Sequence, residues 1–359
     1  MKNFLSLVLT LSFFLTNGIS QIRKYSNEFL AIGVGARALG MSNAVVGSVR
    51  DVTSGYWNPG GLNHLNNDLQ VGLMHANYFA NLAKYDYIGL AKRIDSSSVG
   101  GFSMVRFGVD DIPNTTELID NQGNIDYNRI TTFSAADYAF IFSYARDLGI
   151  KGLYVGANAK IIRRKVGDFA GAWGFGLDAG AQYEKGPWNF GLMLRDVTST
   201  FNAWKFNLDD RMKEVFVQTG NEIPVNSLEI TMPRMIAGVS RWWELGKKFS
   251  LRGAADFDFT FDGKRNVLIK SSVVSIDPHF GVEAGYRDII FLRGGIGNIQ
   301  KETDFRGGTI TTLQPNMGVG LKIKQVALDY GLTDIGDVSA ALYSHIFSLR
   351  FDINKQPKP

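Results

Sequence analysis

The chain has 359 residues, no cysteine, 12% aromatic residues and a formal net charge of +4. The absence of cysteine excludes disulfides, thiolate catalysis and thiolate metal sites. The mild charge, without any run rich in Lys or Arg, argues against a nucleic-acid partner. After the N-terminus, no segment has the 18 uncharged apolar residues typical of a membrane-spanning helix.

The first 20 residues have the pattern of a secretory signal peptide. Lys2 provides a basic start, an apolar run extends from Phe4 to Leu15, and Gly18 and Ser20 are the small residues that precede a cleavage site. The run is shorter than the ~20 residues that a spanning helix needs. We therefore expect a signal peptide over residues 1–20.

Residues 21–66 are rich in Gly and Ala and show no alternation. The tetrapeptide Asn58-Pro59-Gly60-Gly61 is a strong turn signal. Small residues allow a backbone to approach a surrounding wall closely. The pattern predicts short helices and turns packed into a compact hatch, or plug.

From about residue 68 onward the side chains alternate between apolar and polar. In residues 171–184, Trp173, Phe175, Leu177 and Tyr183 fall on one face, and glycines and charged residues fall on the other. This period of two is typical of a β-strand with one apolar and one polar face. A transmembrane barrel needs apolar residues outside and polar residues inside, so the pattern favours a barrel over a sandwich.

Fourteen segments show this pattern, and tight turns alternate with longer links between them. The fold class that we predict is all-β: a 14-stranded antiparallel transmembrane β-barrel over residues 67–353, with the α-helical hatch of residues 21–66 in the lumen and a polar tail at 354–359. The predicted strands are 68–79, 83–94, 97–107, 135–147, 151–164, 171–184, 187–196, 232–243, 247–260, 278–287, 289–298, 314–324, 325–334 and 342–353.

Charged residues of both signs fall on the polar faces of these strands. A selective pore would favour one sign, whereas mixed charges favour internal ion pairs that hold a plug in place. We expect Arg37 of the hatch to pair with a carboxylate of the wall. The residues predicted to face the lumen are Lys160, Asp178, Glu184, Arg252, Asp256, Asp258, Glu283, Arg287, Lys322, Lys324, Arg350 and Asp352.

The sequence offers little support for catalysis or for a cofactor. Gly33–Ala38 and Gly174–Ala179 match a dinucleotide fingerprint, but neither lies in the strand–turn–helix context that such a site requires. The four histidines have no metal-ligand spacing, and no Gly-x-Ser-x-Gly elbow is present. We predict a protein that is not an enzyme and that has no catalytic residues, no metal and no cofactor.

Residues 197–231 form the longest predicted loop. It contains Phe201, Trp204, Phe206 and Phe216 among charged residues. Exposed aromatic residues with mixed charge suit a protein-binding surface. A loop folded over its own barrel mouth would have the same composition, so both interpretations stay open.

The N-terminal motif resembles the signature of the PorV/PorQ family, which is similar to FadL-type transporters. The segments that carry the resemblance are Gly35-Ala36-Arg37-Ala38-Leu39-Gly40-Met41 and Tyr56-Trp57-Asn58-Pro59-Gly60-Gly61-Leu62. The hatch residues that it singles out are Gly35, Arg37, Gly40, Trp57, Asn58, Pro59 and Gly60.

The resemblance implies a multi-pass protein of the bacterial outer membrane with a role in type IX secretion. Its partners would be outer-membrane lipid and other membrane or secretion proteins, such as a translocon and cargo sorting domains, which it would bind through extracellular loops and rim. The alternative that the resemblance implies is a FadL-type channel for hydrophobic small molecules.

Overall fold

The computed structural model describes residues 26–78, 81–119, 122–303, 308–333 and 343–354. The expected signal peptide and almost all of the expected C-terminal tail lie outside the described residues. Within them, four short helices precede the strands: η2 (Glu28–Ala31), α2 (Ala36–Gly40), α3 (Ser54–Trp57) and η3 (Pro59–His64). Two more lie in connections: η4 (Tyr127–Arg129) and α4 (Asp210–Gln218). No helix of the described residues is long and apolar enough to cross a membrane.

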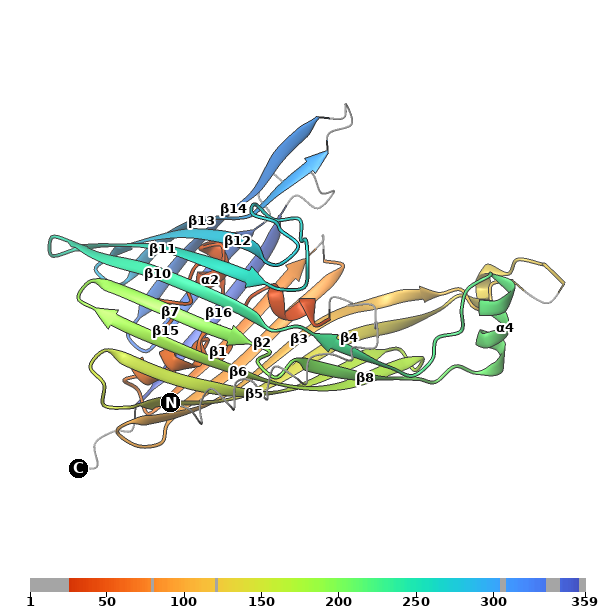
Figure 1. Ribbon diagram of the computed structural model, residues 1–359, viewed down its shortest axis with the longest axis horizontal. Coiled ribbons are helices and arrows are strands. Elements are labelled where there is room, and N and C mark those ends of the chain that lie inside the picture. The colour runs from red at the N-terminus through yellow and green to blue at the C-terminus, as the bar shows by residue number, and fades with distance from the viewer. Residues whose placement is uncertain (1–25, 79–80, 120–121, 304–307, 334–342, 355–359) are drawn as a thin grey trace, which may run out of the picture.

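Antiparallel strands form one closed ring (Figure 1). The pairing of β1 with β16, from Leu69 with Ile353 to Asn77 with His345, joins the two ends of the series of hairpins. The strands are β1 (Leu69–Tyr78), β2 (Ala83–Arg93), β3 (Ser98–Asn114), β4 (Thr131–Asp147), β5 (Leu153–Val166), β6 (Ala170–Lys185), β7 (Trp188–Arg195), β8 (Thr200–Phe206), β9 (Ser227–Thr231), β10 (Arg234–Leu245), β11 (Phe249–Thr260), β12 (Ser275–Tyr286), β13 (Ile290–Thr303), β14 (Thr309–Ile323), β15 (Val326–Thr333) and β16 (Ser344–Ile353).

The segments β7 and β8 belong to one wall strand, and β9 and β10 belong to the next. Each of these two wall strands is interrupted once. β7 and β8 both pair with β6, one after the other, and β10 and β9 pair with β7 and β8 in the same way. The ring therefore has fourteen strands, as the sequence predicted. Two wall strands continue through the predicted loop 197–231, so that prediction is wrong over β8 and β9.

The alternation of each strand separates a lipid-facing surface from a lumen. On β6, Phe175, Leu177 and Tyr183 are exposed, and Asp178 and Gln182 are buried. Met317, Val319 and Leu321 repeat the pattern on β14. These residues are exposed in the isolated chain because their natural neighbour is the hydrocarbon of a bilayer.

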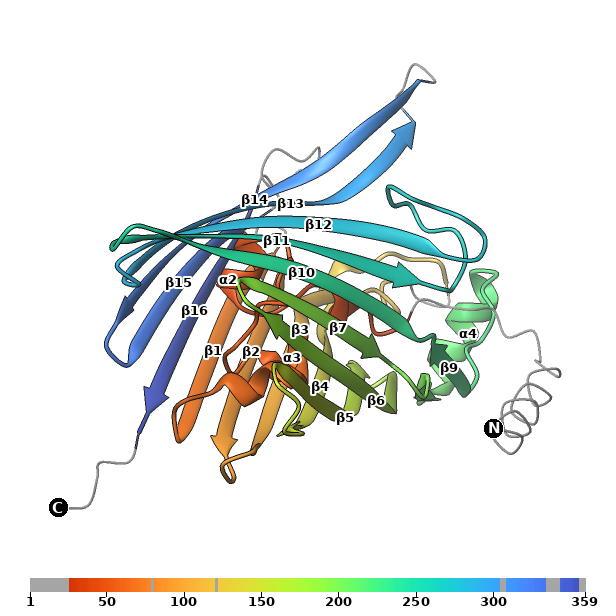
Figure 2. The same ribbon diagram turned by 60° about the vertical axis from the view of Figure 1, so that its left-hand side comes forward.

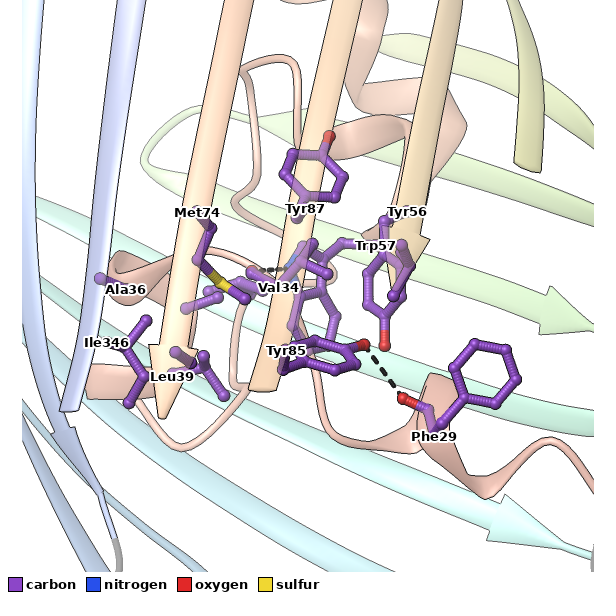
Figure 3. Packing of buried hydrophobic residues seen from close by; sticks show 14 of the residues in the cluster. Phe29, Val34, Ala36, Leu39, Tyr56, Trp57, Met74, Tyr85, Tyr87 and Ile346 are labelled. Carbon is purple, nitrogen blue, oxygen red and sulfur yellow. Dashed lines mark hydrogen bonds between the residues drawn. The ribbon is translucent and has the colours of Figure 1, made fainter. Parts of the chain in front are cut away.

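The lumen is occupied by residues 26–66, which we call the hatch (Figure 2). Its apolar side chains form the largest hydrophobic cluster together with lumen-facing residues of β1–β4 (Figure 3). Met74, Tyr85 and Tyr87 belong to this wall, and the Tyr85 hydroxyl donates to the Phe29 carbonyl at 3.0 Å. The core therefore lies between the hatch and one side of the ring.

Candidate functional site

The Asn58-Pro59 turn fastens the hatch to the wall through one side chain. Asn58 is fully buried, and its amide nitrogen donates to the carbonyls of Val46 at 3.1 Å and of Ala181 on β6 at 2.9 Å. Its side-chain oxygen accepts from the Gly60 N–H at 3.2 Å, which caps η3. Pro59 follows at the first turn of η3, where a backbone N–H would have no helical partner. The turn thus satisfies backbone groups of the hatch and of the wall together.

Close backbone approach explains the many glycines on the polar faces of the strands. A Cβ atom added to Gly180 would lie 2.6 Å from Pro59 Cδ, and one added to Gly60 would lie 2.8 Å from the Tyr154 carbonyl oxygen. Similar contacts surround the hatch on eight strands. The wall glycines whose added Cβ would lie within 3.4 Å of the hatch backbone or of the Pro59 ring are Gly156, Gly180, Gly191, Gly238, Gly281, Gly295, Gly318 and Gly331.

Gly35 and Gly40 bracket the short helix α2. Gly35 has φ +88°, a conformation that other residues rarely adopt, and its N–H donates to Met74 Sδ at 2.9 Å. A Cβ at Gly40 would lie 3.0 Å from the Cα of Gly318 on β14. α2 therefore lies directly against the wall.

Arg37 of α2 binds the wall carboxylate that the sequence led us to expect. Its guanidinium donates to both oxygens of Glu283, at 2.8 and 3.1 Å. Glu283 also accepts from Arg293 at 2.7 Å, and Arg293 reaches Asp329 at 2.6 Å. The prediction of an ion pair between Arg37 and the wall is confirmed.

Trp57 is the aromatic centre of the hatch. Its indole N–H donates to the Val34 carbonyl at 2.8 Å, and its ring meets Tyr56 edge to face at 5.0 Å. The guanidinium of Arg195 lies 4.7 Å from the Tyr56 ring centroid and donates to the Leu30 carbonyl at 2.9 Å. Arg195 is absent from the predicted lumen residues, although alternation along β7 places it on the same polar face as Asn189.

The environment of the hatch shifts the pKa values of His64 and Asp51. Burial, reinforced by the positive charge of Arg50, lowers the pKa of His64 to about 4, although Glu184 lies 3.5 Å from its ring. Burial opposes ionisation of Asp51, but Arg350, at 2.8 Å, and Arg37 outweigh it and lower the pKa of Asp51. Both shifts keep the hatch in one protonation state near neutral pH.

The interruption of the wall is held by a buried charge cluster. Six residues, 195–200, lie between the pairings of β7 and β8 with β6, opposite only three residues of β6, 176–178. Lys160 Nζ lies 2.7 Å from both Asp178 and Asp196, and the Asp196 N–H donates to Asp178 at 2.9 Å. The cluster stabilises this bulge of the wall, residues 195–200, from inside the barrel.

Most of the predicted lumen charges face the lumen, and two do not. Lys160, Asp178, Asp256, Asp258 and Glu283 are buried. The prediction is wrong for Arg287 and Lys324, which have positive φ in tight turns and are exposed. The alternation of inward and outward side chains stops where a turn begins, so it does not predict the orientation of these two residues.

The aromatic residues of the predicted loop lie on two elements. Phe201, Trp204 and Phe206 belong to β8, and Phe216 belongs to α4. Trp204 is already engaged within the sheet: its indole N–H donates to Glu229 at 3.0 Å, and Arg164 covers its ring at 5.0 Å. Phe201, in contrast, is 44% exposed on the outer face. The four residues thus do not form one loop surface.

The lumen contains a cavity of about 720 Å³ between the hatch and the wall. Its lining includes Asp256, Asp258, Arg234, Lys264 and Asn316. A smaller cavity of about 60 Å³ lies beside the bulge and is lined in part by Lys160, Asp196 and Arg234. Both are rich in charged groups. No group of three or more His, Asp or Glu residues suited to a metal ion occurs among the described residues.

A closed 14-stranded antiparallel barrel with an apolar exterior and a filled lumen defines an outer-membrane protein, and the chain is one. Its sequence matches the family described as type IX secretion system protein PorV over residues 20–223, so the chain belongs to the PorV family. No curated protein matches the sequence.

Solved structures of similar fold are FadL-like barrels. The toluene transporter TodX of Pseudomonas putida is 10% identical with a TM-score of 0.57, covering 90% of this chain and 99% of TodX. A Pseudomonas aeruginosa FadL homologue is 11% identical with a TM-score of 0.51, covering 89% of this chain and 98% of its own. At such identities the likeness shows the fold alone.

Proposed function

We propose that this protein is a non-enzymatic component of type IX secretion that binds a translocon or cargo proteins through its surface. Membership of the PorV family supports an association with this secretion system. The observation that carries the proposal is the hatch itself, which Asn58, the Arg37–Glu283 pair and the wall glycines attach to the ring. A barrel in which a plug packs against the wall on many strands would act through its outer surfaces.

The second candidate is a channel for hydrophobic small molecules. The FadL-like fold and the interruption of the wall beside the smaller cavity favour it. Against it, that cavity has only about 60 Å³ and contains Lys160, Asp178 and Asp196 in its lining, which would oppose an apolar solute. Transport would therefore require the hatch to move.

Deletion of the gene in the native host separates the two functions. The secretion function predicts that proteins with C-terminal sorting domains fail to reach the cell surface, measured by surface proteolysis and fractionation, and that re-expression restores them. Normal export together with impaired uptake of a hydrophobic compound would overturn the proposal and favour the channel. Co-purification from native outer membranes then identifies the partner.

A further inference from the structure

The apolar outer surface of the barrel is unequal in height around the ring. On β12, every outward-facing residue from Ile276 to Tyr286 is apolar or aromatic. On β2, only Ile88 and Leu90 lie between the outward-facing Asp86 and Lys92. With a rise of ~3.3 Å per residue and a tilt of about 40°, that interval spans roughly 15 Å of the membrane normal, against about 25 Å for a usual barrel.

A polar cluster of one histidine and two charged side chains lies at one end of this short interval, on three neighbouring strands. His75 on β1 pairs in register with Asp86 on β2, which pairs with Arg106 on β3. His75 Nδ1 lies 2.7 Å from Asp86, and Arg106 lies 3.4 Å from it. Charged side chains on a lipid-facing wall are increasingly unfavourable toward the bilayer midplane. The cluster therefore indicates a neighbour other than hydrocarbon.

Two hollows of the outer surface share Arg106: one, here called the lower hollow, lies over β15, β16 and β1–β3, and the other, the upper hollow, lies over β3–β5 and the chain beside α4. The lower hollow, of about 530 Å³, is lined mainly by apolar residues, among them Leu73, Ile88, Met104 and Phe347. The upper hollow, of about 700 Å³, includes Tyr138 and Lys165 and reaches Met212 of α4. Together they form a surface that changes from apolar to polar along the strands and ends at Met212 of α4.

We propose that the outer face of β1–β3, from Leu73 to Arg106, is the docking surface for a second integral membrane protein. Its wall would be apolar opposite the lower hollow and would carry mixed charges opposite His75, Asp86 and Arg106. An anionic lipid headgroup fits less well, because Arg106 and Lys84 are balanced by Asp86 and Asp110. The inference rests on the proposed function insofar as that function supplies a membrane partner.

Site-specific photocrosslinking in the native outer membrane tests the surface. A benzophenone amino acid replaces Ile88 in the lower hollow, where it is 45% exposed, and the matched control replaces Val282, which is 50% exposed on the apolar outer face of β12. We expect Ile88 to yield a discrete protein adduct and Val282 to yield none. Equal, lipid-only products at both positions would overturn the proposal.

A charge reversal provides an independent measurement. Arg106→Glu should lower recovery of the partner in co-purification by about tenfold or more, because Asp86 and Asp110 would then face a third carboxylate. Lys213→Glu on the exposed face of α4 is the control. Heat-dependent gel mobility verifies that both variants fold.

The outcomes separate this inference from the proposed function. If surface proteins still require the gene and a partner still co-purifies, but no adduct forms at Ile88, the docking surface is wrong and the secretion role stands. If export is normal in the deletion strain, the proposed function fails, whereas an adduct at Ile88 would still support the docking surface.

Discussion

At the scale of single residues, Asn58 connects more backbone than any other position of the predicted motif. Asn58→Ala removes the amide that donates to the carbonyls of Val46 and Ala181; Val46 keeps a second donor in Gln182, whereas the Ala181 carbonyl and the Gly60 N–H lose the Asn58 side chain as their partner. We expect a loss of roughly 2–4 kcal/mol in stability, measured by thermal unfolding in detergent, together with faster proteolysis of the hatch. Asn128→Ala, in an exposed connection, is the control. Unchanged proteolysis in Asn58→Ala would show that the turn does not fasten the hatch.

Glu283 should be more important for stability than Arg37. In Arg37→Met, Glu283 keeps Arg293 as a partner, whereas Glu283→Gln leaves Arg37 and Arg293 facing each other without their shared carboxylate. We expect Glu283→Gln to lower stability by about 3–5 kcal/mol, as for a broken buried pair, and Arg37→Met by less. Thermal midpoints measure the ranking, and the reverse order would contradict it.

His64 should make stability depend on pH. Its pKa of about 4 in the folded state lies below the ordinary 6.5, so the unfolded chain binds the extra proton between these values. Stability should therefore be complete above pH 6.5 and fall by up to about 3 kcal/mol as the pH decreases toward 4. His64→Phe should flatten this part of the profile in thermal midpoints measured at several pH values, and an unchanged profile would contradict this role of His64.

At the scale of elements, adjacent glycines on β13 test the close approach of hatch and wall. A Cβ at Gly295 would lie 2.6 Å from the Ser42 nitrogen, whereas one at Gly294, on the outer face, would meet nothing within 4 Å. We expect Gly295→Ala to shift the hatch and lower the thermal midpoint by several degrees, and Gly294→Ala to be neutral. Equal midpoints would mean that the contact relaxes without cost.

Alternation predicted the number of wall strands but not where they end. β3 continues to Asn114, beyond the predicted end at residue 107, because a bulge between Val109 and Ile112 shifts the register. A second bulge, between Gly297 and Gln300, hides the upper part of β13 in the same way. A bulge moves later side chains to the opposite face, so the period of two is lost although pairing continues.

At the scale of the whole molecule, the filled lumen predicts electrical behaviour. The purified protein should show no steady ion conductance in planar bilayers, because the hatch contacts the wall on many strands. Gly295→Ala should produce intermittent conductance if it displaces the hatch, and Gly294→Ala should not. Steady conductance by the unaltered protein would contradict a closed barrel.

The sequence predicts the kinds of contact in the candidate site better than the partners. Parity placed Glu283 inside and composition placed Arg37 in the hatch, so their pairing was predictable in kind. Which carboxylate Arg37 reaches depends on where the hatch lies along the lumen, and local sequence does not encode that position. Alternation places Arg195 on the polar face, and Lys160 and Asp178 were predicted there. Asp196 joins them only because the wall is interrupted at residues 195–200, where Asp196 and Ser199 have positive φ.

The eight wall glycines also bear on how the protein is made. Their strands surround residues that are synthesised before any of them, and β16, the last to be synthesised, joins β1 beside that same segment. Such close packing around the ring argues against threading the segment into a finished barrel. We therefore expect the hatch to fold and the barrel to close together during biogenesis, with the N-terminal residues acting as a template on which the strands assemble.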